Sequence, residues 1–146
     1  MTEGGHSVAR ARENALTAIF GRPNRMLIGV VHLLPLPASP DYSGGGVEAI
    51  YVRALADARA YADADFHGLI VENHGDIPFS KPEDIGPETA AHMAIATDRV
   101  RAATGLPIGI NVLANAALHA LAIRARQARG SFASINGPTP MSPTKG

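Results

Sequence analysis

Three short apolar runs recur along the chain, and each one ends in a side chain that forms hydrogen bonds. Residues 26–31 lead into His32, residues 68–71 lead into Glu72, and residues 107–110 lead into Asn111. Short runs rich in Ile and Val are typical of strands buried in a parallel sheet. Because the segments between the runs are too long for hairpins, the pattern predicts a parallel α/β architecture.

Helical periodicity fills the segments between these predicted strands. Apolar side chains at helical spacing predict a helix over residues 47–62. A second helix is predicted from Pro87, a residue favoured in a first helical turn, to Gly105, a residue favoured at a helix end. Shorter helices are expected over residues 7–20 and 115–124. This order does not separate a doubly wound sheet from a (β/α)8 barrel, because both repeat the same right-handed unit.

Composition narrows the range of partners and compartments. The chain has 146 residues, enough for one domain, and its 13 basic and 13 acidic residues give a net charge of zero. This balance argues against a general surface for nucleic acid or anionic membrane. The absence of Cys excludes disulfides, thiolate metal sites and a thiol nucleophile. Residues 1–20 lack a continuous apolar core, so we expect neither a signal peptide nor a membrane span. We expect a cytoplasmic location.

Polar side chains gather where the predicted strands end. In parallel α/β proteins, ligands bind at the carboxyl ends of strands, so His32, Glu72 and Asn111 are predicted to meet at one mouth. Glu72 and Asp76 are the candidate catalytic carboxylates, suited to acid–base chemistry or cation ligation. The alternative is structural, because a carboxylate at a strand end also caps the amides of a neighbouring loop.

The remaining candidates are imidazole and amide groups. His32 is a candidate catalytic proton carrier, since imidazole titrates near neutral pH, or else a packed and hydrogen-bonded histidine. Asn73 and Asn111 are suited to orienting a hydroxyl-rich ligand, with loop and cap bonding as the alternative. His74 is a weaker ligand-binding candidate, because a single loop imidazole is often solvated. The sequence establishes no metal site, and no motif identifies a cofactor.

Four segments, in this order, resemble the BtpA/SgcQ family: residues 28–37, 68–79, 86–89 and 109–113. The resemblance covers roughly Arg25 to Ile123. It implies a TIM (β/α)8 barrel about twice as long as this chain, of which roughly the first three or four β/α units would be present. The sequence departs from the family at residues 63–65, Asp-Ala-Asp, where a Gly-Gly helix end is usual. That change removes the easy left-handed cap.

We expect three segments: a lead-in over residues 1–24, a partial barrel over 25–123 and a divergent tail over 124–146. The tail has three prolines and no acidic residue. As codons, residues 138–145 can be read in a shifted frame as Ala-Asn-Ala-Tyr-Val-Ala-Asn-Glu, which resembles the family's expected sequence at this point. We therefore predict a reading-frame change shortly after Ile123, with an ordinary disordered tail as the alternative. The codons of the gene decide between the two.

Three functional hypotheses follow. The first is an enzyme-like barrel that binds a small polar or phosphorylated metabolite, with Glu72 or Asp76 as general acid or base and no reaction named. The second, implied by the resemblance alone, is a non-catalytic photosystem I biogenesis factor with peripheral thylakoid association. The third is a non-functional half barrel, because unpaired strand edges and an uncovered inner face favour low stability, aggregation or a homo-oligomer.

Overall fold

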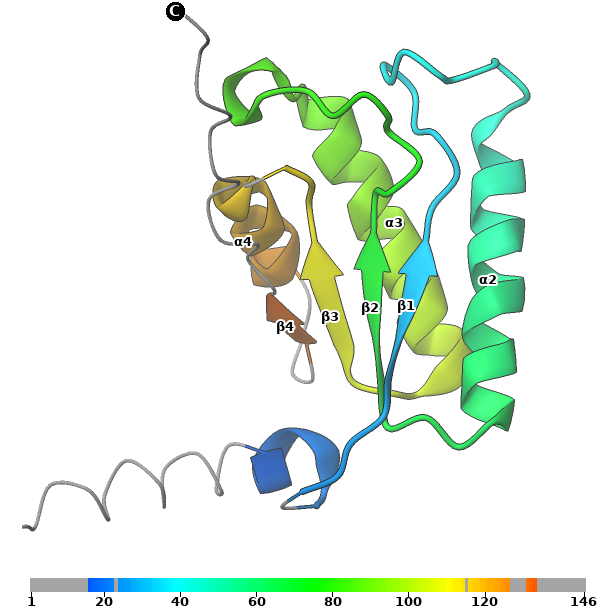
Figure 1. The fold of residues 1–146 in the computed structure, drawn as a ribbon, viewed down its shortest axis with the longest axis vertical. Helices are drawn as coiled ribbons and strands as arrows, with labels where there is room; N and C mark the ends of the chain where they lie inside the picture. Colours follow the sequence, from blue (N-terminus) through cyan, green and yellow to red (C-terminus); the bar gives the residue numbers. More distant parts are fainter. Residues whose placement is uncertain (1–15, 23, 115, 127–130, 134–146) are drawn as a thin grey trace, which may run out of the picture.

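The computed structural model describes residues 16–22, 24–114, 116–126 and 131–133 (Figure 1). A short helical stretch over residues 16–20 precedes the first strand. The elements that follow are β1 (Ile28–His32), α2 (Val47–Asp63), β2 (Gly68–Glu72), a 3-10 turn η1 (Pro82–Asp84), α3 (Pro87–Thr104), β3 (Ile108–Asn111), α4 (Ala117–Arg126) and β4 (Ser131–Ala133). The predicted alternation of strands and helices is therefore confirmed.

The strands form one four-stranded sheet in the order β1-β2-β3-β4. Every neighbouring pair is parallel, so each helix carries the chain back to the start of the next strand. In this register, His32 is level with Glu72, and Glu72 is level with Asn111. The parallel α/β architecture predicted from the apolar runs is confirmed.

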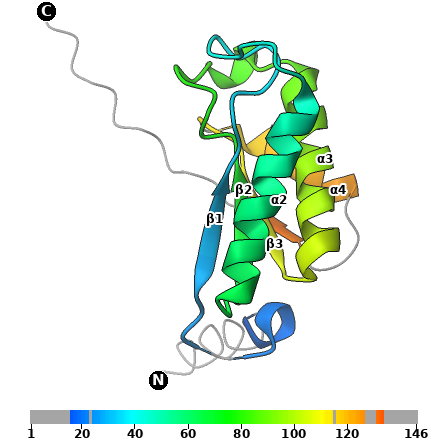
Figure 2. The same ribbon diagram turned by 90° about the vertical axis from the view of Figure 1, so that its right-hand side faces the viewer.

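The described helices lie on one side of the sheet (Figures 1 and 2). Alternate residues of the strands point at these helices and are completely buried; they are Val31, Leu69, Val71, Ile108 and Ile110. The helices complete the core with Ile50, Ala54 and Ala58 of α2 and Met93, Ala96 and Val100 of α3. Full burial of each large aliphatic side chain contributes about 1.5–3 kcal/mol, so this layer is the main source of stability.

None of the helices α2, α3 and α4 covers the other face of the sheet (Figure 2). Its strand residues are more accessible: Ile28 is 37% exposed, and Val30 and Ile70 are half-buried. Phe20 approaches this face at its lower end, because a Cβ added to Gly68 would lie 2.7 Å from the Phe20 ring. Within the described residues, one face of the sheet is therefore largely open, and whether it is the inner face of a barrel stays a prediction.

Helix α3 begins and ends where the sequence indicates. Pro87 occupies the first turn, where its missing N–H would have no helical partner. At the other end Gly105 adopts the left-handed conformation with φ 68°, and its N–H donates to the Arg101 carbonyl at 2.8 Å. Both end signals predicted from the sequence are confirmed.

A polar cluster ties α2 to α3 beside the core. The Tyr51 hydroxyl and His92 Nδ1 are 2.7 Å apart, and the Arg99 guanidinium lies 4.4 Å from the centre of the Tyr51 ring. Arg99 also donates to Glu48 at 2.6 Å. Burial raises the pKa of Tyr51, against the lowering effect of the Arg99 charge. The Tyr51 phenol therefore stays neutral well into the alkaline range, which preserves the contact with His92.

The end of α2 contains Asp-Ala-Asp at residues 63–65, where the family usually has Gly-Gly. The helix ends at Asp63, and Asp65 then adopts φ 59°, a left-handed conformation. Asp tolerates this region better than most residues, but it is still less favourable there than Gly. Phe66 N–H donates to the Tyr61 carbonyl at 3.2 Å, so the turn closes despite the missing glycine.

Replacing Asp65 by glycine should stabilise the protein. Asp65→Gly relieves the left-handed strain, and we expect the free energy of unfolding to rise by about 0.5–1 kcal/mol in urea denaturation. The control is Ala60→Gly on the exposed surface of α2, which should lower it by about 1 kcal/mol. A loss of stability in Asp65→Gly comparable to that of the control would contradict the described turn.

Candidate functional site

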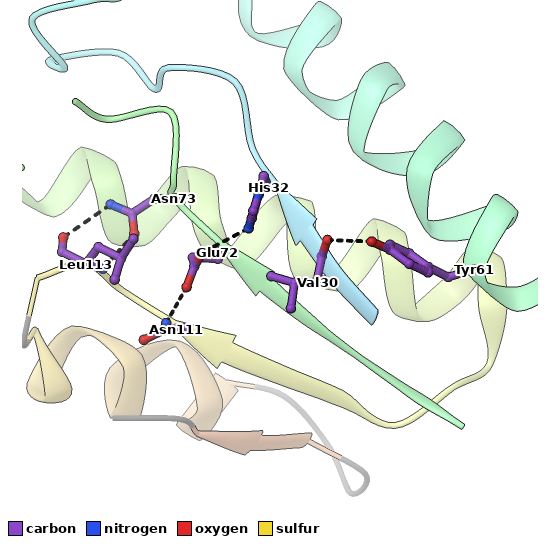
Figure 3. Close-up of polar contacts among 7 residues, drawn as sticks. All are labelled: Val30, His32, Tyr61, Glu72, Asn73, Asn111 and Leu113. Carbon is purple, nitrogen blue, oxygen red and sulfur yellow. Dashed lines mark hydrogen bonds and ion pairs between the residues drawn. The ribbon is translucent and has the colours of Figure 1, made fainter. Parts of the chain in front are cut away.

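The last residues of three neighbouring strands meet at one end of the sheet. His32 closes β1, Glu72 closes β2 and Asn111 closes β3. Because the strands are parallel and level, these side chains project from the same face, and Figure 3 shows Glu72 between the other two. The structure brings together the three residues that the strand pattern places at one mouth.

The Glu72 carboxylate binds both neighbours. Its Oε2 lies 3.1 Å from His32 Nε2, and its Oε1 accepts a hydrogen bond of 2.5 Å from Asn111 Nδ2. The Glu72 side chain is 13% exposed, whereas that of His32 is 53% exposed. Hydrogen bonds to a carboxylate are stronger than those between neutral groups, so Glu72 is held firmly while the imidazole reaches solvent.

A second imidazole lies against the first. The rings of His32 and His74 are stacked, with centroids 4.3 Å apart and planes inclined by 17°. Phe79 meets His74 edge-on at 6.2 Å between centroids. His74 and Phe79 are both exposed, so the loop after β2 adds an aromatic rim beside the Glu72 carboxylate. Phe79 was not among the candidate site residues, although it ends the segment 68–79 that carries the family resemblance.

Asp76 and Asn73 lie in a different environment from Glu72. Both are buried, and the two carboxylate oxygens of Asp76 accept hydrogen bonds, one of 2.8 Å from Leu36 N–H and one of 3.0 Å from Asn73 Nδ2. Asn73 Oδ1 in turn accepts from Leu113 N–H at 2.7 Å. These bonds join the loops that follow β1, β2 and β3. Asp76 and Asn73 therefore have the contacts expected of residues that hold loops together, which was the structural alternative for each of them.

Close backbone contact explains the glycine between these polar residues. Gly75 N–H donates to the Leu33 carbonyl at 3.1 Å. A Cβ at position 75 would lie 2.6 Å from both Leu33 O and Pro35 N, closer than real Cβ contacts allow. Gly75 therefore lets the loop after β2 fold against the loop after β1, and this places His74 over His32.

A hollow of about 690 Å³ opens beside the site, between α2 and the outer edge of β1. His32 and His74 line one side of it, and Arg53, Asp57 and Tyr61 of α2 line the other. Glu72 and Asn111 are not among its lining residues, so the hollow reaches the site through the imidazoles. Across the described ranges, no three His, Cys, Asp or Glu side chains converge in a way that would hold a metal ion.

Comparison with known proteins places the sequence motifs in context. Residues 23–143 match the BtpA family. The match continues past Ile123, the residue at which we expected the resemblance to end. The predicted frame change concerns residues that lie mostly outside the described part of the chain, and it stays a prediction.

The curated relatives are longer proteins. An uncharacterised protein of Pyrococcus abyssi is 45% identical over 113 residues, which are 77% of this chain and 42% of the relative. An uncharacterised protein of Archaeoglobus fulgidus is 42% identical over 112 residues, 77% of this chain and 44% of the relative. The photosystem I biogenesis protein BtpA of Synechocystis is 45% identical over 97 residues, 66% of this chain and 33% of the relative. The chain spans less than half the length of these relatives.

No solved structure matches the chain significantly. Among the residues that the structure describes, no helix has the length and apolar content needed to cross a bilayer.

Removing the Asp76 carboxylate should loosen the three loops. Asp76→Ala leaves the buried Leu36 N–H without an acceptor, and we expect the free energy of unfolding in urea to fall by about 1–3 kcal/mol. Asp41→Ala, at an exposed aspartate, is the matched control and should change it by less than about 0.5 kcal/mol. Equal effects of the two substitutions would show that the Asp76 network does not hold the loops.

Proposed function

The chain belongs to the BtpA family, and on that basis we propose that it forms β/α units of a TIM-type barrel that bind a small polar or phosphorylated metabolite. The proposed binding site is the mouth formed by His32, Glu72 and Asn111. The observation that carries the proposal is the Glu72 carboxylate held between an imidazole and an amide at the ends of three parallel strands. In TIM barrels and in open α/β sheets, this end of the sheet is the one that binds ligands.

The barrel itself is part of the proposal. Support comes from the sequential order of the four parallel strands and from the helices that cover a single face. In a barrel, the uncovered face with Val30 and Ile70 points to the interior, and the strand ends form the rim. Sites built on strand ends are positioned more precisely than sites built on loops alone.

The proposed chemistry is proton transfer by the Glu72–His32 pair. The exposed imidazole of His32 takes a proton from a ligand hydroxyl or carbon acid, and the adjacent Glu72 carboxylate stabilises the resulting imidazolium. Asn111 fixes the carboxylate from the other side. This assignment gives the acid–base role to Glu72 and His32 together, and gives Asp76 the role of holding the loops.

The remaining candidates have supporting roles. His74 and its neighbour Phe79 form a flat rim that a polar ring or chain would contact on entry. Asn73 links the loop after β2 to the loop after β3. This link holds the position of the neighbouring residues Glu72 and His74. The reaction is left unnamed, because a fold and an acid–base pair are shared by many chemistries.

The second candidate function is photosystem I biogenesis. It is favoured by one observation, that the Synechocystis relative is a photosystem I biogenesis protein. The relatives in Pyrococcus abyssi and Archaeoglobus fulgidus are about as similar to this chain and are described as uncharacterised proteins. The photosystem role therefore rests on one relative, whereas the ligand site rests on the geometry of this chain, so we favour ligand binding.

An NMR titration tests the proposal. Ribose 5-phosphate serves as the phosphorylated probe and ribose as the neutral polar probe, and either is expected to shift the resonances of His32, His74 and Asn111. Glu72→Gln should weaken the binding roughly 10- to 100-fold, because it removes a charged hydrogen-bond acceptor. Glu83→Gln, at an exposed glutamate of η1, is the control and should leave binding unchanged. Undiminished binding in Glu72→Gln, or shifts confined to other parts of the sheet with both probes, would contradict the site.

A further inference from the structure

We propose that the chain binds one calcium ion in a small polar cavity between the loops that follow β1 and β2 and the start of α3. These segments lie at the carboxyl end of the sheet (Figure 1). The cavity has a volume of about 30 Å³. The side chains on which the proposal rests all line it; they are Ser39, Asn73, Asp76, Asp84, Glu88 and Thr89.

Carboxylates give this cavity a negative charge. Asp76, Asp84 and Glu88 line it, and the described residues contribute no Lys, Arg or His to its wall. Asp76 is only 9% exposed, so solvent screens its charge weakly. A buried negative charge without a cationic partner is unfavourable, and a bound cation would compensate it.

Two hydroxyl groups at the cavity lack hydrogen-bond partners within the described part of the chain. Thr89 is 8% exposed and its hydroxyl is unpaired there, and the buried Ser39 Oγ has no partner either. Thr97, further along α3, instead donates to the Met93 carbonyl at 2.7 Å. Thr89 lies in the first turn, where no helical carbonyl precedes it. Unpaired buried hydroxyls are rare, and a hard cation takes oxygen ligands.

The Asp76 carboxylate can bind a cation without losing its present hydrogen bonds. Its two oxygens accept one N–H group each, from the Leu36 backbone and from Asn73 Nδ2. A carboxylate has about four lone-pair positions, so each oxygen keeps one for another partner. The two N–H donors hold the carboxylate in a fixed position, which lowers the cost of ordering a metal ligand.

The N-terminus of α3 opposes a cation, because the helix dipole places about half a positive charge there. The Glu88 carboxylate offsets this effect. It lies over the first turn, where a Cβ added to Gly86 would collide with its oxygens. Because a full negative charge exceeds half a positive one and Asp76 adds a second, the charge around the cavity stays negative.

The size of the cavity and its donor groups favour calcium over other metal ions. A volume of about 30 Å³ has room for about two waters, or for one ion in their place. Magnesium usually keeps several waters, whereas calcium accepts irregular sets of oxygen ligands. Since no three carboxylate or imidazole side chains converge within the described ranges, hydroxyl and carbonyl oxygens would complete the ligand set around Asp76 and Glu88.

A bound ion would connect segments that border the candidate site. Ser39 belongs to the loop after β1, Asp76 to the loop after β2, and Thr89 to α3. The loop after β2 also contains His74, so the ion would restrain the rim next to the Glu72 carboxylate. The calcium site does not depend on the proposed ligand, because His32, Glu72 and Asn111 are not among the residues that line the cavity.

Isothermal titration calorimetry of the full chain tests the calcium site. After divalent ions have been removed with EDTA, calcium chloride should bind with one ion per chain and a Kd of roughly 10⁻⁵–10⁻³ M. Magnesium chloride at matched ionic strength should bind at least about tenfold more weakly. No binding of calcium up to roughly 10 mM, or equal binding of the two ions, would overturn the proposal.

Removing the unpaired hydroxyl should weaken calcium binding. Thr89→Val keeps the shape of the side chain but takes one oxygen from the cavity, and we expect the Kd for calcium to rise roughly tenfold. Thr97→Val, at a buried threonine of the same helix that does not line the cavity, is the matched control and should leave the Kd unchanged. Equal Kd values for the two variants would contradict a role of Thr89 in the site.

NMR of the wild-type chain gives a result that does not depend on the folding of any variant. Calcium chloride should shift the backbone amide resonances of Ser39, Asp76 and Thr89. The amides of Arg53 and Asp57, an exposed ion pair on α2, should not move beyond the effect of sodium chloride at the same ionic strength. Shifts confined to exposed carboxylates elsewhere, or identical shifts with the two salts, would overturn the proposal.

Discussion

The level register of β1, β2 and β3 is the constraint on which the site depends. Parallel strands joined by helices all end on the same side of the sheet, and the pairing sets His32, Glu72 and Asn111 side by side. A shift of the β2 register by one residue would turn Glu72 toward the helices and leave its carboxylate without either partner. The buried layer of Val31, Val71 and Ile110 opposes such a shift, because it would move these side chains out of the core.

The fold could be predicted from sequence to a large extent, because the signals that specify it are local. Apolar runs mark the strands, and Pro87 and Gly105 mark the ends of α3. The mouth could be predicted for the same reason, since the ends of parallel strands must meet. The different environments of Glu72 and Asp76 could not be predicted from the sequence. Both are carboxylates after one strand, and only the fold of the loop at Gly75 shows that Asp76 turns inward to the Leu36 amide.

Long-range contacts account for the other differences. Tyr61 lies on the periodic face of α2, and nothing in its neighbourhood along the chain indicates a bond to the Val30 carbonyl. Asp65 adopts a conformation that usually belongs to glycine, because the helix end is closed by backbone bonds from Ala64 and Phe66. The predicted tail and its frame change fall mostly on residues outside the described part, so the fold neither supports nor opposes them.

The helices cover one face of the sheet and leave the other face open directly below the candidate site. Helices on one face stabilise the strands, and the opposite face with Ile28, Val30 and Ile70 is left for other contacts. In a closed barrel this face becomes the interior below the rim. In the proposed barrel, the polar groups at the strand ends would form the rim and the apolar groups beneath them would fill the interior.

The central claim is that Glu72 joins His32 and Asn111 at a common rim, and nuclear Overhauser effects test it most directly. The side-chain amide protons of Asn111 should show contacts to the Glu72 methylene protons, and the His32 ring protons should show contacts to the same methylenes. Both sets are expected from the short distances of the two carboxylate oxygens to their partners. Contacts from only one of the two neighbours, or from neither, would contradict the account.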